Sequence, residues 1–141
     1  MKIIIAPDSF KGSLTSTEAA HAIACGLRDA DPYATLVEIP LADGGEGSVE
    51  AVAERLDAQI VTIDTVNPLM KKMTAKYAIA ETAEGKTAII ETAAASGLNT
   101  VSRDERDIMA SSTFGTGLII ADAFSRGCRN FIVGLGGSAT N

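Results

Sequence analysis

Residues 130–141 read NFIVGLGGSATN, an apolar run that leads into a glycine-rich turn. The run at 130–135 has the character of a strand. A glycine-rich turn after a strand leaves backbone N–H groups free to hold phosphate oxygens, because a residue without a Cβ lets the ligand come close. The predicted phosphate-binding residues of this turn are Gly136, Gly137, Ser138, Thr140 and Asn141. A helix is expected to follow such a turn, so we interpret the chain as the N-terminal part of a longer protein.

Strand-like and helix-like segments alternate upstream of this turn. The apolar run at 2–6 predicts a strand buried on both faces, and 35–39 and 59–63 predict two more. The spacing of Thr15 and Glu18 predicts a capping box at the start of a helix that ends near residue 30, and a second helix is predicted near 48–57. Aromatic residues make up only 4% of the chain, so the core must be aliphatic. These patterns favour an α/β fold with three layers, in which helices cover both faces of a parallel sheet.

The pattern changes after residue 65. Strand-like segments at 73–80 and 86–92 flank the residues TAEG, which predicts a β-hairpin. This β-rich piece interrupts the alternation, so we interpret it as the start of an inserted second domain. The predicted organisation is a first part of the α/β domain at 1–65, the hairpin region of the inserted domain at 66–100, and a helix and strand leading to the truncated glycine-rich loop at 101–141.

Three polar loops, at 8–13, 43–48 and 136–141, each follow a predicted strand. In a parallel sheet such loops open at one edge, where ligands bind, so we expect them to converge. The first loop offers Asp8 and Lys11, which suit the handling of a phosphate or a substrate. An ordinary helix-entry loop, in which Asp8 makes turn hydrogen bonds, is the alternative.

The second loop reads DGGEGS and carries two acids among three glycines. Oxygen-rich acidic loops hold Mg²⁺ directly or through water, so Asp43 and Glu46 are the candidate metal ligands. The alternative is that one of them caps the helix that follows. Residues 111–117 form a further cluster of hydroxyls and glycines at a helix start, where Thr116 and free amides could bind an anion. The alternative there is an N-cap.

Composition argues against several classes of function. The net charge is −6 and the basic residues are scattered, which argues against a nucleic acid or an anionic membrane as partner. No apolar run approaches the roughly 20 residues that span a bilayer. Cys25 and Cys128 are far apart and are expected to be free thiols, as in a cytoplasmic protein. The only histidine, His21, lies beside a buried helical stripe without a partner acid, which argues against a Ser-His-Asp site.

Two motif tests bear on nucleotide binding. The chain has no GxxxxGK[ST] sequence and therefore no Walker-type loop. Gly134, Gly136 and Ala139 match the relaxed dinucleotide fingerprint GxGxxA after a strand. A dinucleotide-dependent oxidoreductase is therefore an alternative enzyme, and an inactive truncated nucleotide-binding fragment is the alternative that is not an enzyme.

Five stretches, taken together, occur in the order seen in one family. They read APDSFKGSL at 6–14, PLADGGEG at 40–47, ETAAASGL at 91–98, FGTG at 114–117 and GLGGSATN at 134–141. On these motifs the chain resembles the bacterial glycerate kinases of the type-1 family. The resemblance implies ATP-dependent phosphorylation of D-glycerate with Mg²⁺. It also implies two α/β domains, one flavodoxin-like, which is a Rossmann-like arrangement, and one inserted.

The resemblance also suggests roles for the candidate residues. A hydroxyl of glycerate would attack the γ-phosphate of ATP in line, a reaction that asks the protein for positioning and charge neutralisation. Lys11 would neutralise phosphate oxygens or the substrate carboxylate. Asp43 and Glu46 would organise Mg²⁺, or one of them would orient the attacking hydroxyl. Asp8 is the alternative to Asp43 as base, and a base beyond Asn141 is left open, as is association into a homo-oligomer.

Overall fold

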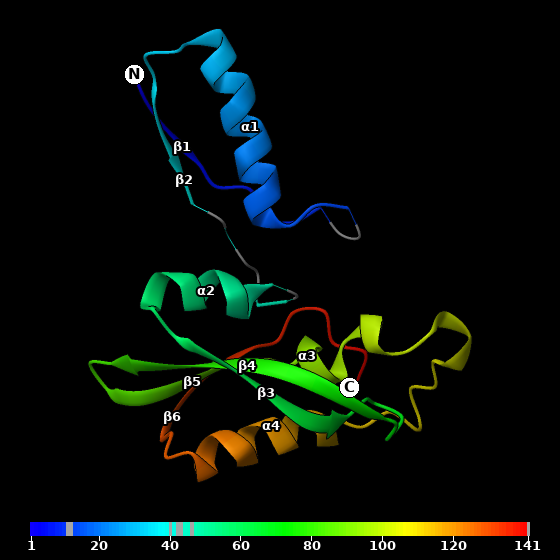
Figure 1. The fold of residues 1–141 in the computed structure, drawn as a ribbon. Helices are drawn as coiled ribbons and strands as arrows, with labels where there is room; N and C mark the ends of the chain where they lie inside the picture. The colour runs from blue at the N-terminus through cyan, green and yellow to red at the C-terminus, as the bar shows by residue number, and fades with distance from the viewer. Residues whose placement is uncertain (11–12, 40, 42–43, 46, 141) are drawn as a thin grey trace. The chain divides into compact units, whose positions relative to one another are not determined.

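The computed structural model describes residues 1–10, 13–39, 41, 44–45 and 47–140 (Figure 1). Lys11, Asp43, Glu46 and Asn141, four of the predicted site residues, lie outside this set. The contacts group the chain into two compact units, Met1–Asp43 and Gly44–Asn141, and each unit is described by itself.

The first unit is a parallel strand pair with one helix against it. Strands β1 (Lys2–Ile5) and β2 (Thr35–Glu38) pair from Lys2 opposite Thr35 to Ile5 opposite Glu38. Helix α1 (Ser16–Ala30) packs against them, and Ile5, Ala20 and Ala24 form the centre of this small core. The parallel βαβ arrangement predicted for the start of the chain is therefore confirmed.

The start of α1 is the predicted capping box. The Thr15 hydroxyl oxygen accepts from the Glu18 backbone N–H at 3.2 Å, and the Glu18 carboxylate accepts from the Thr15 N–H at 2.8 Å. Two of the N–H groups that no helical carbonyl can reach are thus satisfied by side chains. The helix ends at Ala30, two residues before a proline, as predicted.

The second unit is built on a four-stranded sheet in the order β3-β4-β5-β6. Its strands are β3 (Gln59–Val66), β4 (Lys72–Thr82), β5 (Gly85–Glu91) and β6 (Asn130–Gly134). The predicted hairpin is confirmed as β4 and β5. The sheet is mixed rather than parallel, because β3, β4 and β5 pair antiparallel and only β5 and β6 pair parallel. Five residues join β3 to β4, which is too few for the crossover that parallel neighbours require.

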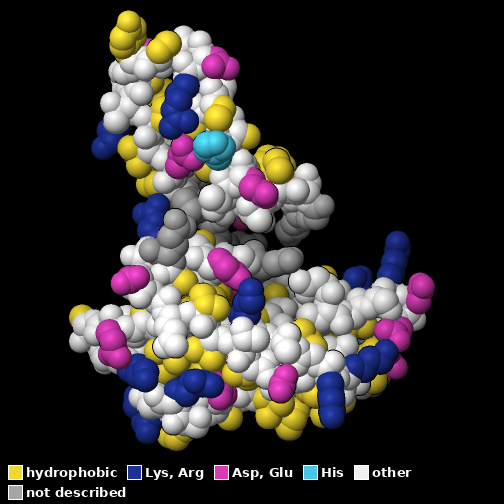
Figure 2. Space-filling view, viewed as in Figure 1, with side chains coloured by type: hydrophobic (Ala, Val, Ile, Leu, Met, Phe, Trp, Pro, Cys, Tyr) yellow, Lys and Arg dark blue, Asp and Glu magenta, His cyan; other side chains and the backbone are white. Residues whose placement is uncertain are grey.

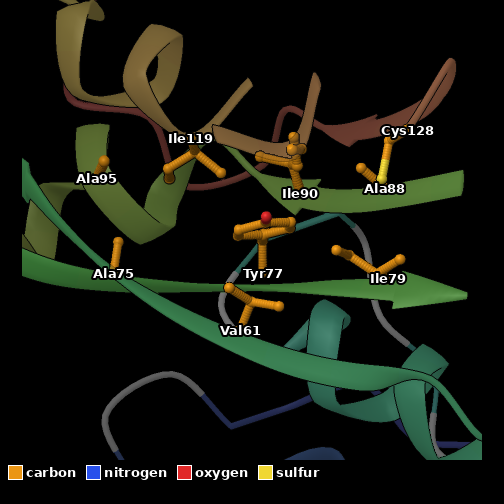
Figure 3. Packing of buried hydrophobic residues seen from close by; sticks show 10 residues of the cluster. Val61, Ala75, Tyr77, Ile79, Ala88, Ile90, Ala95, Ile119 and Cys128 are labelled. Atoms are coloured by element: carbon orange, nitrogen blue, oxygen red, sulfur yellow. The ribbon is translucent and has the colours of Figure 1, made fainter. Parts of the chain in front are cut away.

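Helices cover both faces of this sheet (Figure 1). On one face, α2 (Ser48–Leu56) packs Val49 and Ala53 onto alternate residues of β4 and β5. On the other face, α4 (Phe114–Ser125) contributes Ile119 and Ala123, with Tyr77 fully buried at the centre of the cluster (Figure 3). The short helix α3 (Ala93–Ser96) follows β5, and two 3₁₀ turns follow it, η1 (Leu98–Thr100) and η2 (Arg103–Glu105).

The helix predicted to start near residues 111–117 is confirmed as α4. It buries Ala123 and leaves Ala121 and Phe124 exposed. The guanidinium of Arg129 lies 4.1 Å from the centre of the Phe124 ring and covers it on the surface.

Strand β3 was expected to belong with the first domain, yet its partner strand is β4 in the second unit. The predicted domain limits at 65/66 and 100/101, together with the flavodoxin-like and inserted domains, stay predictions. On the face in Figure 2, Lys and Arg side chains are interspersed with Asp and Glu. Among the described residues, no helix combines the length and apolar character needed to cross a bilayer.

Candidate functional site

Three chain segments meet backbone to backbone in the second unit. They are Gly44 ahead of α2, the residues at the end of β5, and the residues after β6. The Thr92 N–H donates to the Gly134 carbonyl at 2.8 Å, and the Gly136 N–H donates to the Gly44 carbonyl at 3.2 Å. We call this meeting point the glycine junction, and define it by Gly44, Thr92, Gly134 and Gly136. Two of the three predicted polar loops, those at 43–48 and 136–141, are therefore in contact.

The glycines of the junction are required by its geometry. A Cβ built on Gly134 would stand 2.8 Å from the Cα of Gly44 and closer still to the Gly44 carbonyl oxygen. Gly44 itself has φ of +86°, which an L side chain rarely adopts. The glycine-rich sequences that mark these loops thus serve the approach of one backbone to another at this point.

The predicted phosphate loop continues from the junction onto α3. The Ala139 N–H donates to the Ser96 carbonyl at 2.7 Å, and the Leu98 N–H donates to the Gly137 carbonyl at 3.0 Å. The Ser138 hydroxyl lies 3.0 Å from that of Thr140. Among the described residues, the N–H groups of Gly137 and Ser138 donate no hydrogen bond, whereas those of Gly136 and Ala139 are already used. The loop therefore has two consecutive amides free to bind an anion.

Thr116 is placed inside the fold. Its hydroxyl lies 2.8 Å from that of Ser96, whose side chain is fully buried, and 3.4 Å from the Thr92 carbonyl. Thr116 itself is 7% exposed. The hydroxyl that was predicted to bind an anion thus links the first turn of α4 to α3, and it adjoins the glycine junction through Thr92.

Glu91 is a functional candidate that motif reasoning did not single out. Its side chain is 6% exposed and reaches the start of α2, where its Oε1 accepts from the Val49 N–H at 2.5 Å. Burial raises the pKa of the Glu91 carboxyl, and hydrogen bonds from the amides of Val49, Gly47 and Ser48 oppose that rise. The available signal was an acid at the end of the apolar strand AII, where a buried charge needs a partner.

A cavity of about 410 Å³ lies beside this carboxylate. Its polar lining includes Glu91, Glu50, Lys76, Asn99 and Thr100. The cavity is bounded by the first turn of α2, by β4 and by η1. A volume of this size admits a small molecule.

Asp8 lies in the first unit, on the loop after β1. Its carboxylate is exposed and accepts from the Ser9 N–H at 2.7 Å, the turn hydrogen bond that was its alternative explanation. That the loop at 8–13 joins the other two stays a prediction. Within the part of the chain that the structure describes, no group of three or more Asp, Glu, His or Cys residues could hold a metal ion, and both predicted metal ligands lie outside that part.

Comparison with protein families decides the classification. The model of the Glycerate kinase family matches residues 3–141. The chain belongs to this family. It is 46% identical to the glycerate 2-kinase of Escherichia coli K12 over 141 residues, which are all of this chain and 36% of that protein. It is 43% identical to a glycerate kinase of Haemophilus influenzae, again over the whole chain and 37% of the relative.

A solved structure agrees with the family match. The chain superposes with a TM-score of 0.76 and 45% identity on the crystal structure of a candidate glycerate kinase 2 from Salmonella typhimurium LT2, covering all of this chain and 37% of that one. The chain thus spans little more than a third of the length of these glycerate kinases. The family match does not favour the dinucleotide-dependent oxidoreductase, and Gly134, the first glycine of that fingerprint, packs on the Gly44 backbone instead.

Proposed function

We propose that the full-length protein carrying this chain transfers the γ-phosphate of ATP to D-glycerate in the presence of Mg²⁺. The family match over residues 3–141 supports this proposal most directly. The name of the Escherichia coli relative specifies the 2-position of glycerate, and we propose the same hydroxyl as acceptor here. The same proposal places the enzyme in the cytoplasm, in keeping with two free thiols.

Each loop would have its own role in phosphoryl transfer. The free amides of Gly137 and Ser138 would hold phosphate oxygens, and Ser138 and Thr140 would add hydroxyl donors. Lys11 would neutralise phosphate charge or bind the glycerate carboxylate. Either Asp43 or Asp8 would orient the attacking hydroxyl. Thr116 is buried and would contribute indirectly, because its hydroxyl joins α4 to Ser96 and to the carbonyl of Thr92.

The donor chemistry of the acidic loop fits the proposed metal. Asp43 and Glu46 supply carboxylate oxygens, the hard ligands that Mg²⁺ prefers. Bound there, Mg²⁺ would supply neutralisation of the negative charge on the phosphate oxygens. The chain's own part is to hold the acidic loop against the phosphate loop, which are joined by the hydrogen bond between Gly136 and Gly44.

A coupled assay for ADP release tests the proposal. The full-length protein is given D-glycerate, ATP and Mg²⁺, with L-glycerate and glycerate-free reactions as controls. We expect ADP release that depends on D-glycerate and a product identified by NMR as the 2-phosphate. ADP release at the glycerate-free rate would overturn the kinase proposal, and the 3-phosphate as product would overturn the proposed position.

A further inference from the structure

Helix α2 lacks a cap of its own among the described residues. Its N-cap is Gly47, which has no side chain, and the buried Ser48 hydroxyl finds no hydrogen-bond partner in the described part of the structure. The first amides of a helix need an acceptor, and leaving them buried without one is costly. The Ser48 N–H donates to the Gly45 carbonyl at 3.2 Å, whereas the acceptor for the Val49 N–H is the carboxylate of Glu91, which lies 42 residues further along the chain.

The charge on Glu91 suits this place. The Val49 N–H donates to the carboxylate at 2.5 Å, and the helix dipole favours an anion at this end. Burial raises the pKa of Glu91, whereas the amides of Val49, Gly47 and Ser48 lower it. Hydrogen bonds to an ionised acceptor are stronger than those between neutral groups. Glutamine at this position would keep the size of the side chain and one acceptor oxygen but lose the charge.

Glu91 also sits where the chain leads directly into the glycine junction. The next residue, Thr92, donates to Gly134, and Gly136 after β6 donates to Gly44 ahead of α2. One closed path of contacts therefore runs from Glu91 to Thr92, Gly134, Gly136, Gly44 and back to Glu91 through the start of α2. Hydrogen-bond networks can be worth more than the sum of their pairwise contacts, so we expect the loss of one member to weaken others in the ring.

We propose that Glu91 is a positioning residue, whose anionic carboxylate holds the start of α2 and thereby sets the acidic loop against the phosphate loop. This inference rests on the proposed function for its effect on activity, but its structural part stands without it. Glu91 would touch neither nucleotide nor metal, and would act through the amides of α2. Its removal would lower turnover by misplacing the loops, with less effect on the binding of glycerate.

The test uses Glu91→Gln in the full-length protein, with Glu105→Gln as the matched control. Glu105 is an exposed acid paired with Lys71, and its loss is expected to leave kinetics and exchange unchanged. For Glu91→Gln we expect kcat to fall at least tenfold and the KM for glycerate to change less than threefold. Hydrogen exchange followed by mass spectrometry should quicken in peptides spanning 44–49 and also in those spanning 134–138, which pair with the Glu91 backbone at Gly134 but, among the described residues, donate no hydrogen bond to its carboxylate.

The outcomes separate the two proposals. Exchange that quickens only at 44–49, or kinetics within twofold of the wild type, would overturn the positioning role. If the wild-type protein releases no ADP with glycerate, the proposed function fails, whereas the exchange experiment still decides the role of Glu91. Should Glu91→Gln not fold, Glu91→Asp, which keeps the charge but draws the oxygens back by one methylene, is judged by the same two measurements.

Discussion

Replacement of Gly134 by alanine tests the glycine junction directly. The new Cβ would stand 2.8 Å from the Cα of Gly44, below the 3.0 Å under which real Cβ atoms are essentially never found. Ordinary contact begins at 3.4 Å, so the two backbones must separate by at least 0.6 Å. Forcing extra volume into a closely packed place of this kind costs about 1–3 kcal/mol of unfolding free energy.

The same displacement would act on catalysis. A misplacement of about 1 Å in an active site can cost on the order of a hundredfold in rate, so we expect kcat/KM for ATP to fall between about tenfold and a hundredfold. The assay is glycerate-dependent ADP release by the full-length protein, together with the midpoint of urea unfolding. Gly26→Ala is the control, because nothing lies within 4 Å of a Cβ at this position in α1 and alanine is expected to stabilise the helix by up to about 1 kcal/mol. Wild-type kinetics and an unchanged midpoint in Gly134→Ala would refute the reasoning.

Three further changes probe separate parts of the chain. Tyr77→Phe removes a buried hydroxyl that donates to Asp122 at 2.7 Å, and should lower the unfolding free energy by about 1.5 kcal/mol. Tyr33→Phe, at an exposed position, is the control and should leave the unfolding free energy unchanged. Equal urea midpoints for the two variants would count against the hydrogen bond. Thr15→Ala breaks the capping box and should cost about 1 kcal/mol at pH 7. Hydrogen bonds from the Thr15 N–H and hydroxyl hold the pKa of Glu18 below its usual value, and of these alanine removes only the hydroxyl bond. The stability that this bond gives is present above the usual pKa and is lost as the pH falls, so urea midpoints at pH 7 and pH 3 should show a smaller cost of Thr15→Ala in acid. Lys11→Ala should lower kcat/KM at least tenfold, about 1.4 kcal/mol of transition-state stabilisation, and wild-type kinetics would remove Lys11 from the site.

Local signals in the sequence predicted local structure well. The spacing of Thr15 and Glu18 was enough to place the start of α1, because a capping box is a contact within one turn. The turn residues TAEG placed the β4–β5 hairpin for the same reason. The direction of β3 relative to its neighbour was predicted wrongly, although the five residues that link it to β4 could have indicated antiparallel pairing.

Contacts between distant segments were harder to predict. The polar motif at 111–117 indicated a hydroxyl at a helix start, but only the fold shows that the Thr116 hydroxyl lies 2.8 Å from that of Ser96. Glu91 lies within a recognised motif, yet the Val49 amide that donates to its carboxylate lies 42 residues earlier. The glycine-rich turn after β6 was assigned to ligand approach, whereas Gly134 also lets its main chain touch that of Gly44.

The mixed sheet also implies an order of folding. Strands β3, β4 and β5 are joined by short turns and form mostly local contacts, which close at little entropic cost. Strand β6 pairs with β5 only when the loop formed by the 38 residues at 92–129 has closed. We therefore expect the three-stranded meander to form in the transition state, with φ-values near zero for β6. The predicted phosphate loop, which follows β6, would then be the last part of this unit to fold.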